Sequence, residues 1–423
     1  MLISLLYIIL SPLLWVILFF VSLINIKVGR HWKNQKHTIR NTKQKIMDSC
    51  NNRKIVLFHA TSAGEFEQIK PILELMDKNK YFVIISFFSP TIFEKENNNE
   101  LADAVCYHPF DFPWSAFSFF KSLNLDYYII TRHDIWPTHI LFAKILKIKP
   151  ILINANLHNN SFWHKFNLCH FNKQVFSKFD KILTGSERLK KKLKSIVGDK
   201  MVICTGDSRF DQVKIRMKNA QMDHFSKDIH KTKNILLGSI DKSDLKVLVE
   251  GIKLAYPNGD KSLSNYKHRL IIVPHEIDEY TLALIELNFR KLQHNIVRYT
   301  QMKDNLPNTI LVDKIGVLAD LYGYAEIAYV GAGFGAGVHS VIEPAVYGCA
   351  VSFGPNIQLL DEAVEMTENN IGIIIKNSND FYQFLKLLNK DDKRKKFQSE
   401  THLFVKNKYR SSQLIINEIF NGE

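Results

Sequence analysis

The sequence predicts an α/β protein in which two doubly wound domains follow an N-terminal membrane-anchor helix. The chain has 423 residues, which is long for a single domain. Short apolar runs alternate with helical stretches in both halves, a pattern typical of parallel sheets covered by helices. Residues 2–25 form an apolar run without a charged side chain.

That apolar run is long enough to cross the hydrocarbon core of a bilayer, which takes about 20 residues. Residues 27–45 follow it with seven Lys or Arg and no acid. Because the positive residues come after the apolar run and no small-residue cleavage pattern is present, a signal peptide is not predicted. We expect an uncleaved anchor with the rest of the chain in the cytoplasm. Pro12 also allows a kinked, monotopic insertion, so both modes stay open.

The uneven distribution of charge argues against a nucleic-acid partner. Half of the net charge of +14 lies beside the anchor, where each Lys or Arg facing anionic lipids adds about 1 kcal/mol. The cysteines are odd in number and never spaced as C-x-x-C, which predicts reduced thiols and neither a disulfide framework nor a zinc site. They are Cys50, Cys106, Cys169, Cys204 and Cys349.

The elements group into two halves separated by a polar, charged stretch at 213–233. Parallel strands place ligands beyond their carboxyl ends, so two facing domains would form a cleft between them and the residues just after each strand carry the function. The predicted organisation is an anchor at 1–26, a basic segment at 27–50, a Rossmann-like domain at 51–215, a linker at 216–232, a second Rossmann-like domain at 233–400, and a C-terminal helix at 401–423 that returns to the first domain.

Glu65 is the first candidate, in the turn between the strand "KIVLFHA" and a helix. An acid in the first turn of a helix is favoured by the helix dipole, by about 0.3–1 kcal/mol. The small residues Thr61 to Gly64 would also let a substrate approach, with Glu65 as its general base. Both interpretations are open from this segment alone.

Two further candidates follow strands of the first half. Asp134, in "TRHDIWPTH", is either an acid in the cleft or the N-cap of the next helix. Arg209, in "TGDSRFD", is a cation after the strand "MVIC", although a single Arg is more often a solvated surface residue.

The segment "YVGAGFGAGVHSVIEPAVYGCAVSFGP", residues 329–355, predicts a strand, a glycine-rich turn, a helix ending at Gly348 and a second strand. Four glycines and a helix N-terminus near His339 and Ser340 favour a nucleotide phosphate site, with Glu343 near a ribose. Purely structural glycines are the alternative. A dinucleotide site is not predicted, because G-x-G-x-x-G fails at Ala336.

Other catalytic patterns are absent from the sequence: G-x-x-x-x-G-K-[ST], H-E-x-x-H and G-x-S-x-G do not occur. His275 follows the strand "RLIIVP" and is a candidate for binding a donor, or a structural histidine.

Taken together, these segments resemble the Kdo (3-deoxy-D-manno-octulosonic acid) transferase family, lipid A-modifying glycosyltransferases with the GT-B fold. The resemblance runs over nearly the whole chain and rests on the order and spacing of its motifs. These are "HATSAGE" for His-x-x-Ser-x-Gly-Glu, "HPFDFP" for Pro-x-Asp-x-Pro, "DIWP" for acid-x-Trp-Pro, "NANL" for Asn-Ala-Arg-Leu, "TGDSRFD" for Thr-Gly-x-x-Lys-Phe-Asp, and "GVHSVIEP" for Gly-Gly-His-Asn-x-x-Glu-Pro.

The resemblance implies inverting transfer of Kdo from CMP-Kdo to a lipid A precursor, lipid IV-A, at the inner membrane during lipopolysaccharide synthesis. It implies no metal and no cofactor, since CMP-Kdo is a co-substrate. Glu65 would be the general base, Arg209 would stabilise the transition state in place of Lys, and Ser62 and Gly64 would form the acceptor loop. The donor-binding positions would be Pro274, His275, Ile315, Gly316, Val317, Ser340, Val341, Ile342 and Glu343.

Some positions depart from the family pattern. The first acid of the family's Glu-x-Glu-x-Trp-Pro is Arg132 here, so Asp134 is a substitute by proximity only. No Arg stands beside Pro274-His275, and Ser340 replaces an Asn. These departures keep two alternatives open: a GT-B transferase that uses a UDP- or GDP-sugar, and an inactive scaffold that binds lipid or a partner.

Overall fold

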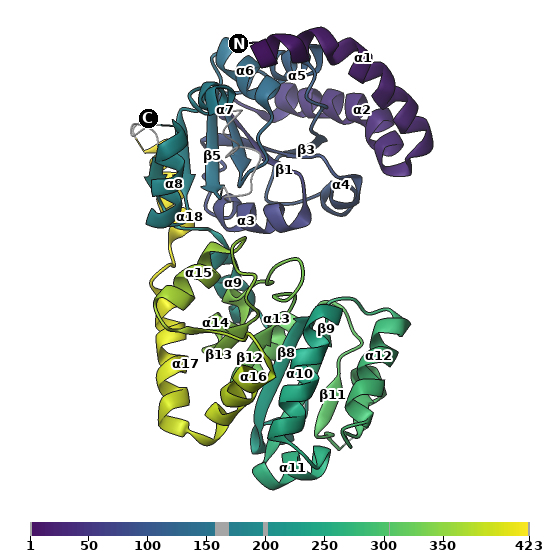
Figure 1. The fold of residues 1–423 in the computed structure, drawn as a ribbon. Helices are drawn as coiled ribbons and strands as arrows, with labels where there is room; N and C mark the ends of the chain where they lie inside the picture. Colours follow the sequence, from purple (N-terminus) through teal and green to yellow (C-terminus); the bar gives the residue numbers. More distant parts are fainter. Residues whose placement is uncertain (1, 157–168, 198–201, 304, 422–423) are drawn as a thin grey trace. The chain divides into compact units, whose positions relative to one another are not determined.

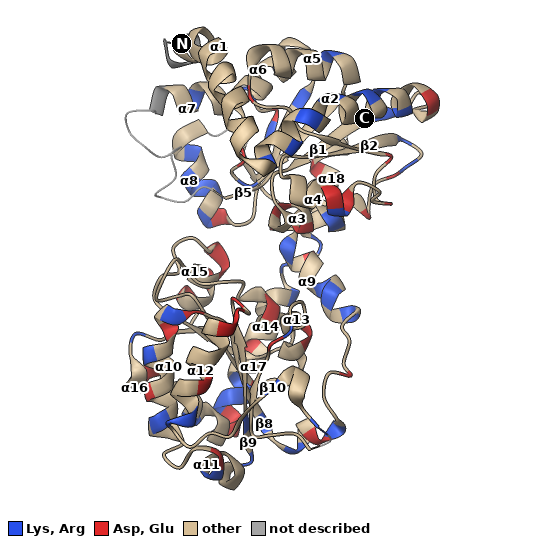
Figure 2. Cartoon of the chain, turned by 90° about the vertical axis from the view of Figure 1, so that its right-hand side faces the viewer, with Lys and Arg blue, Asp and Glu red and all other residues tan. Residues whose placement is uncertain are grey.

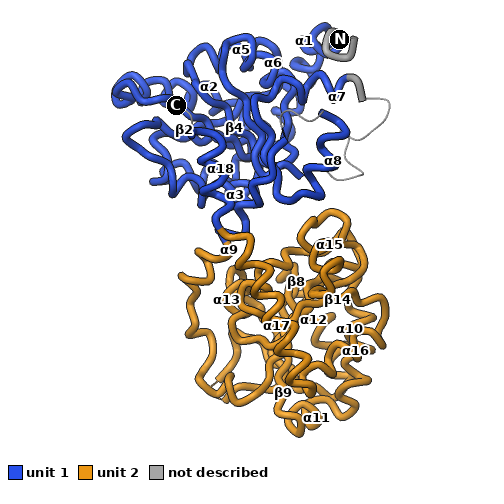
Figure 3. Tube along the Cα trace, turned by 90° about the vertical axis from the view of Figure 1, so that its left-hand side faces the viewer, with its two compact units in different colours: residues 1–212, 410–423 blue, residues 213–409 orange. Residues whose placement is uncertain are grey.

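A computed structural model describes residues 2–156, 169–197, 202–303 and 305–421. The chain divides into two compact units (Figures 1 and 3). Unit 1 comprises residues 1–212 and 410–423, and unit 2 comprises residues 213–409. Leu157, the last residue of the "NANL" motif, lies outside the described residues.

Unit 1 contains a seven-stranded, all-parallel sheet in the order β3-β2-β1-β4-β5-β6-β7. The predicted α/β class is therefore confirmed for this half. Its strands are β1 (Lys54–Ala60), β2 (Tyr81–Phe87), β3 (Ala104–Tyr107), β4 (Tyr127–Thr131), β5 (Lys149–Ala155), β6 (Lys181–Thr184) and β7 (Val202–Cys204).

Helices cover both faces of this sheet and bury apolar side chains in two clusters. The last helix of the chain belongs here, since Ile415 and Ile419 join the cluster that also contains Phe66. The helices are α3 (Ala63–Leu73), α4 (Pro90–Glu96), α5 (Pro113–Leu123), α6 (Pro137–Ile145), α7 (Cys169–Phe176), α8 (Glu187–Val197), α18 (Ser411–Phe420) and the start of α9 (Arg209–Lys218).

Unit 2 repeats the architecture with a parallel sheet in the order β10-β11-β9-β8-β12-β13-β14. The apolar runs that the sequence shows in this half correspond to its first six strands and leave out the edge strand β14, which has three residues. The strands are β8 (Lys233–Ile240), β9 (His268–Pro274), β10 (Ile296–Arg298), β11 (Thr309–Leu311), β12 (Ile327–Val330), β13 (Ala350–Phe353) and β14 (Gly372–Ile374).

One large apolar cluster lies between this sheet and helices α10, α12 and α16. The stretch predicted as a linker, 216–232, contains the end of α9, which stops at Lys218, and a short 3₁₀ helix, η3 (Lys227–Lys231). The helices of unit 2 are α10 (Lys242–Ala255), α11 (Gly259–Tyr266), α12 (Glu279–Arg290), α13 (Leu318–Leu321), α14 (Ile342–Val346), α15 (Asp361–Glu368), α16 (Ser378–Leu385) and α17 (Asp391–Lys406).

The basic segment forms a helix of unit 1, α2 (Ile26–Ser49). Ile39 and Ile46 pack against one of the two apolar clusters of unit 1. The buried ring of His31 lies 2.9 Å from the carbonyl oxygen of His108. The Lys and Arg side chains of α2 are exposed, and Figure 2 colours their positions along the helix blue. One face of α2 is therefore built into unit 1 while the other carries the positive charge.

The apolar helix α1 (Leu2–Ile24) lies against α2 and also reaches the body of unit 1. The rings of Trp15 and Trp32 are 5.3 Å apart, and the hydroxyl of Tyr7 donates to the carbonyl of Asp111 at 2.6 Å. Apolar side chains from Leu6 to Ile24 stay exposed along the helix, and that stretch is long and apolar enough to cross a membrane.

Close backbone packing in unit 2 depends on Gly331, the residue after β12. A β-carbon there would lie 2.2 Å from the carbonyl oxygen of Ser239 and 2.5 Å from Cα of Ile240. Both neighbours are backbone atoms at the end of β8, so neither can turn aside as a side chain would. The glycine is what lets these two chain segments touch.

We therefore expect Gly331→Ala to destabilise unit 2 by about 1–3 kcal/mol, the range for overpacking. Denaturant unfolding followed by far-ultraviolet circular dichroism measures the loss. All five tryptophans precede residue 164 and thus belong to unit 1, so the fluorescence transition of unit 1 should stay in place. Gly64→Ala is the control, because its methyl group would meet nothing within 4 Å. An unchanged dichroism transition in Gly331→Ala would contradict the packing argument.

Candidate functional site

The candidate residues gather at the carboxyl ends of the two sheets. In unit 1, the connections leave in opposite directions from the neighbouring strands β1 and β4, and in unit 2 from β8 and β12. Such switch points are where open α/β sheets bind ligands. Glu65 follows β1, Asp134 follows β4, and the glycine-rich segment follows β12.

Glu65 lies in the first turn of α3, and its side chain is held by the loop before it. Ser62 is the N-cap and accepts from the amide of Glu65 at 3.3 Å. One carboxylate oxygen, Oε2, accepts from the amide of Thr61 at 2.8 Å and from its hydroxyl at 2.5 Å. Among the residues that the structure describes, none donates to the other oxygen, Oε1. Capping and catalysis are thus compatible, because they use different oxygens.

Gly64 leaves open space beside this carboxylate, since nothing lies within 4 Å of where its β-carbon would be. Pro71 does not interrupt the helix, which continues to Leu73.

Buried polar side chains fix α3 relative to the loop that carries Arg209. The hydroxyl of Ser208 donates to the carbonyl of Gln68 at 2.6 Å, and Asn154 bonds Ser208 at both its amide and its hydroxyl, at 3.0 and 2.7 Å. Thr131 donates to the side chain of Gln68 at 3.3 Å. All four residues are 1% exposed or less. The segments after β1 and β7 are therefore connected to each other and to the ends of β4 and β5.

Arg209 is not a solvated surface residue. Its Nε and a terminal nitrogen lie 3.0 and 2.8 Å from the carboxylate of Asp207, whose other oxygen accepts from the amide of Arg209. Burial acts to raise the pKa of Asp207, but Arg209 and then Arg132 outweigh it, so the pKa is lowered. The positive charge of Arg132, which stands in place of the family acid, thus acts on a carboxylate from another loop.

The N-cap interpretation of Asp134 is wrong. Helix α6 begins at Pro137 with Trp136 as its N-cap. The carboxylate of Asp111 accepts hydrogen bonds from the amides of Thr138 and His139, at 3.4 and 3.1 Å. This role for the Asp of "HPFDFP" was not predicted, because Asp111 lies 28 residues before His139. It became visible only in the fold.

Asp134 instead faces a buried histidine. Its Oδ2 lies 3.1 Å from Nε2 of His59, which is close enough for an ion pair. The two atoms do not form a hydrogen bond, because their geometry does not meet the requirements for one. The other ring nitrogen of His59 lies about as close to Ser86, and the ring is tilted by 32° against that of His108, with centroids 3.8 Å apart. Burial first, and then His59, hold the pKa of His108 well below its usual value.

In unit 2, His275 lines a cavity of about 370 Å³ at the carboxyl ends of β8 and β9. Its ring stacks on that of His339 with centroids 4.3 Å apart. Glu276, which the sequence places beside His275 after the same strand, lines the cavity as well. Sequence reasoning missed the other lining residues, because they belong to the end of β8, the start of α10 or the start of α12. These are Ile240, Asp241, Lys242, Ser243 and Thr281.

The remaining donor candidates differ in what they can present. Val317, Val341 and Ile342 are 5% exposed or less, so they offer a ligand only their backbone. Ile315 is 83% exposed. Glu343 lies 3.3 Å from a terminal nitrogen of Arg216 in α9. Of the other candidates, Pro274 ends β9 with its side chain buried, Gly316 takes a left-handed φ of 88°, and Ser340 is half-buried.

The glycine-rich segment differs from the prediction. Helix α14 has five residues and runs from Ile342 to Val346, so it starts later than His339 and ends before Gly348. The space at Gly333 is occupied by the backbone of Gly354, and that at Gly335 by Ser243 and Asp241. These glycines make room for neighbouring segments of the protein, which favours the structural alternative.

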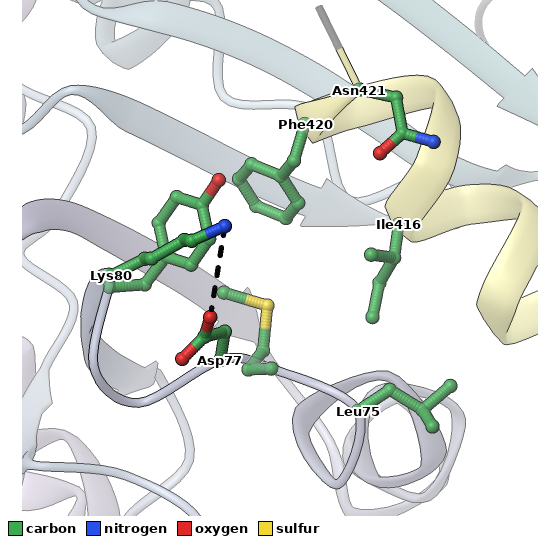
Figure 4. A pocket seen from close by; sticks show the side chains of 8 residues that line it. Leu75, Asp77, Lys80, Ile416, Phe420 and Asn421 are labelled. Carbon is green, nitrogen blue, oxygen red and sulfur yellow. Dashed lines mark ion pairs between the residues drawn. The ribbon is translucent and has the colours of Figure 1, made fainter. Parts of the chain in front are cut away.

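A second cavity, of about 360 Å³, lies at the opposite edge of the unit 1 sheet, beside the start of β2 (Figure 4). Phe420 and Ile416 of α18 form one wall, and Asp77 and Lys80 form another. None of the predicted site residues lines it. In the described residues, no group of three or more His, Cys, Asp or Glu is placed to hold a metal ion.

Comparison with known proteins indicates the family that the chain resembles. Residues 30–212 match the sequence model of the 3-deoxy-D-manno-octulosonic-acid transferase (kdotransferase) family. The 3-deoxy-D-manno-octulosonic acid transferase of Aquifex aeolicus is 28% identical over 335 residues, covering 78% of this chain and 85% of the relative. That of Rickettsia prowazekii is 24% identical over 373 residues, covering 84% and 76%.

The fold has solved counterparts as well. A glycosyltransferase from Rickettsia africae superposes with a TM-score of 0.61 at 16% identity, over 88% of this chain and all of that one. The family match and the curated relatives therefore support a glycosyltransferase of the 3-deoxy-D-manno-octulosonic-acid transferase type, and the solved structure supports a GT-B-like fold.

Proposed function

We propose that this protein transfers Kdo from CMP-Kdo to a lipid A precursor with inversion of the anomeric carbon. The observation that carries the proposal is the Glu65 carboxylate at the end of β1, with Oε2 fixed by Thr61 and Oε1 available. A general base must reach the proton that it removes, and a fixed carboxylate with one open oxygen meets that condition.

In the proposed step, Glu65 accepts the proton of the attacking sugar hydroxyl. The hydroxyl oxygen bonds to the anomeric carbon of Kdo from the face opposite the nucleotide. The bond from that carbon to the phosphate oxygen breaks, and CMP leaves with the electron pair. Positively charged groups favour this separation of charge. Arg209, held by Asp207, and Arg132 would provide them.

The proposed acceptor is a lipid, and the N-terminus supports an encounter at a membrane surface. Helix α1 is attached to unit 1 near both ends, by Tyr7 at Asp111 and by the close contact of Ser22 with Gly29. We propose that α1 inserts in the plane of the inner membrane with its exposed apolar face in the lipid. The cations of α2 would then meet anionic headgroups.

Replacing the base should remove turnover and spare donor binding. Glu65→Gln keeps the shape and an oxygen for the amide of Thr61, but it cannot accept a proton. We expect kcat for Kdo transfer from CMP-Kdo to lipid IV-A to fall about 10²–10⁴-fold, while CMP affinity measured by calorimetry stays unchanged. Glu67→Gln, two residues along α3, is the control and should keep its activity. Near-normal turnover in Glu65→Gln would overturn the assignment.

The nucleotide specificity separates the proposal from a transferase of another sugar donor. We expect CMP to stabilise the protein against heat more than UDP or GDP at equal concentration, since binding to the folded state raises stability by mass action. A thermal-shift series with the three nucleotides is the measurement. Stronger stabilisation by UDP would remove CMP-Kdo as the donor.

The orientation of α1 predicts where the N-terminus lies. With Ser4→Cys, an in-plane helix keeps residue 4 on the cytoplasmic side, together with the five native cysteines. A membrane-impermeant maleimide should then label the variant only after spheroplasts are broken. Labelling of intact spheroplasts, with the native protein unlabelled, would show instead that α1 spans the membrane.

A further inference from the structure

The cavity beside His275 contains more acidic than basic side chains. Asp241 and Glu276 line it, and Lys242 is its one Lys or Arg among the described residues. A nucleotide phosphate in this cavity would meet two carboxylates. Binding such an anion requires a compensating positive charge, and the structure limits where that charge can come from.

The N-terminus of α10 does not provide it. Asp241 is the N-cap, and its carboxylate accepts from the amide of Ser243 at 2.7 Å and from the hydroxyl of Ser243. The carboxylate of Asp244 accepts from the amide of Asp241 at 2.9 Å, which completes a capping box. This helix end thus already carries a negative side chain, which offsets its attraction for anions.

His339, whose ring stacks on that of His275, does not provide a fixed charge either. Burial first, and then the neighbouring His275, lower the pKa of His339 below its ordinary value. His339 is therefore neutral at pH 7 and can hydrogen-bond a ligand without contributing a cation.

Lys242 is the first residue of α10, and its side chain is exposed at the cavity. Its Nζ lies 4.5 Å from the centroid of the Tyr280 ring, which belongs to α12. A cation–π contact of this kind is worth about 0.5–1 kcal/mol at an exposed site. The ammonium group is thus held beside the cavity by a ring from a different helix.

We propose that Lys242 is the cation that binds the phosphate of the nucleotide donor, with Tyr280 as the residue that positions it. The inference rests on the proposed function, since it takes the donor to be a nucleoside monophosphate ester such as CMP-Kdo. Lys242 would contact the phosphate and not the nucleoside, so its loss should discriminate between ligands with and without phosphate.

The test compares CMP with cytidine, measured by calorimetry and by competition on the full-length protein. Lys242→Gln should weaken CMP about tenfold, as expected for an exposed charged partner, and leave cytidine unchanged. Lys242→Arg should restore most of the affinity. Tyr280→Ala should weaken CMP about threefold, and Tyr280→Phe should not. Lys246→Gln, an exposed lysine one turn along α10, is the matched control and should bind like the native protein.

The outcomes distinguish this inference from the proposed function. If the native protein binds neither CMP nor CMP-Kdo, both are overturned. If it binds CMP and transfers Kdo but Lys242→Gln retains full CMP affinity, the assignment of Lys242 alone is wrong. Equal weakening of CMP and cytidine would also overturn it, because that result would make Lys242 part of the nucleoside site.

Discussion

The geometry of unit 1 depends on the buried hydrogen bonds that join Ser208, Asn154 and Gln68. A parallel sheet brings the ends of its strands to one edge, but it does not fix the loops beyond that edge. Here Ser208 bonds the backbone of α3 three residues after Glu65, and it directly precedes Arg209. Each of these buried polar groups would be costly if left unpaired, so the loops have one favourable arrangement. Glu65 and Arg209, the proposed base and the proposed cation, are positioned by the same contacts.

A second constraint acts on the charges around that site. The position where the family pattern has an acid carries Arg132 here, and Asp207 experiences its field together with that of Arg209. The two arginines offset the carboxylates of Asp207 and Glu65, which would otherwise repel a departing phosphate. Asp134 is withdrawn from this group, because it faces His59.

Unit 2 follows a different principle, since its glycines bring backbone segments together. Gly331 packs on the end of β8 and Gly333 on Gly354, so the glycine-rich segment closes the sheet edge and does not leave an open cradle. The cavity lies next to this packed region, between β8, β9 and the helices that follow them. Two carboxylates, those of Asp241 and Glu276, line this cavity together with one exposed lysine, Lys242. Lys242 is therefore the proposed partner for an anionic ligand.

By itself, the sequence determined the two α/β halves, the apolar and basic N-terminus and the segments that carry the site. These are patterns of neighbouring residues, so periodicity and motif order reveal them. Only the tertiary structure decided which partner each side chain meets. Asp111 and not Asp134 caps α6, and Gly331 and Gly333 pack against backbone atoms. Lys242 lines the same cavity as His275. Such contacts join residues far apart in the chain, and the same residue types are compatible with other pairings. Strand β14 was missed for a related reason, because three residues are too few for a periodic signal and its place depends on pairing with β13.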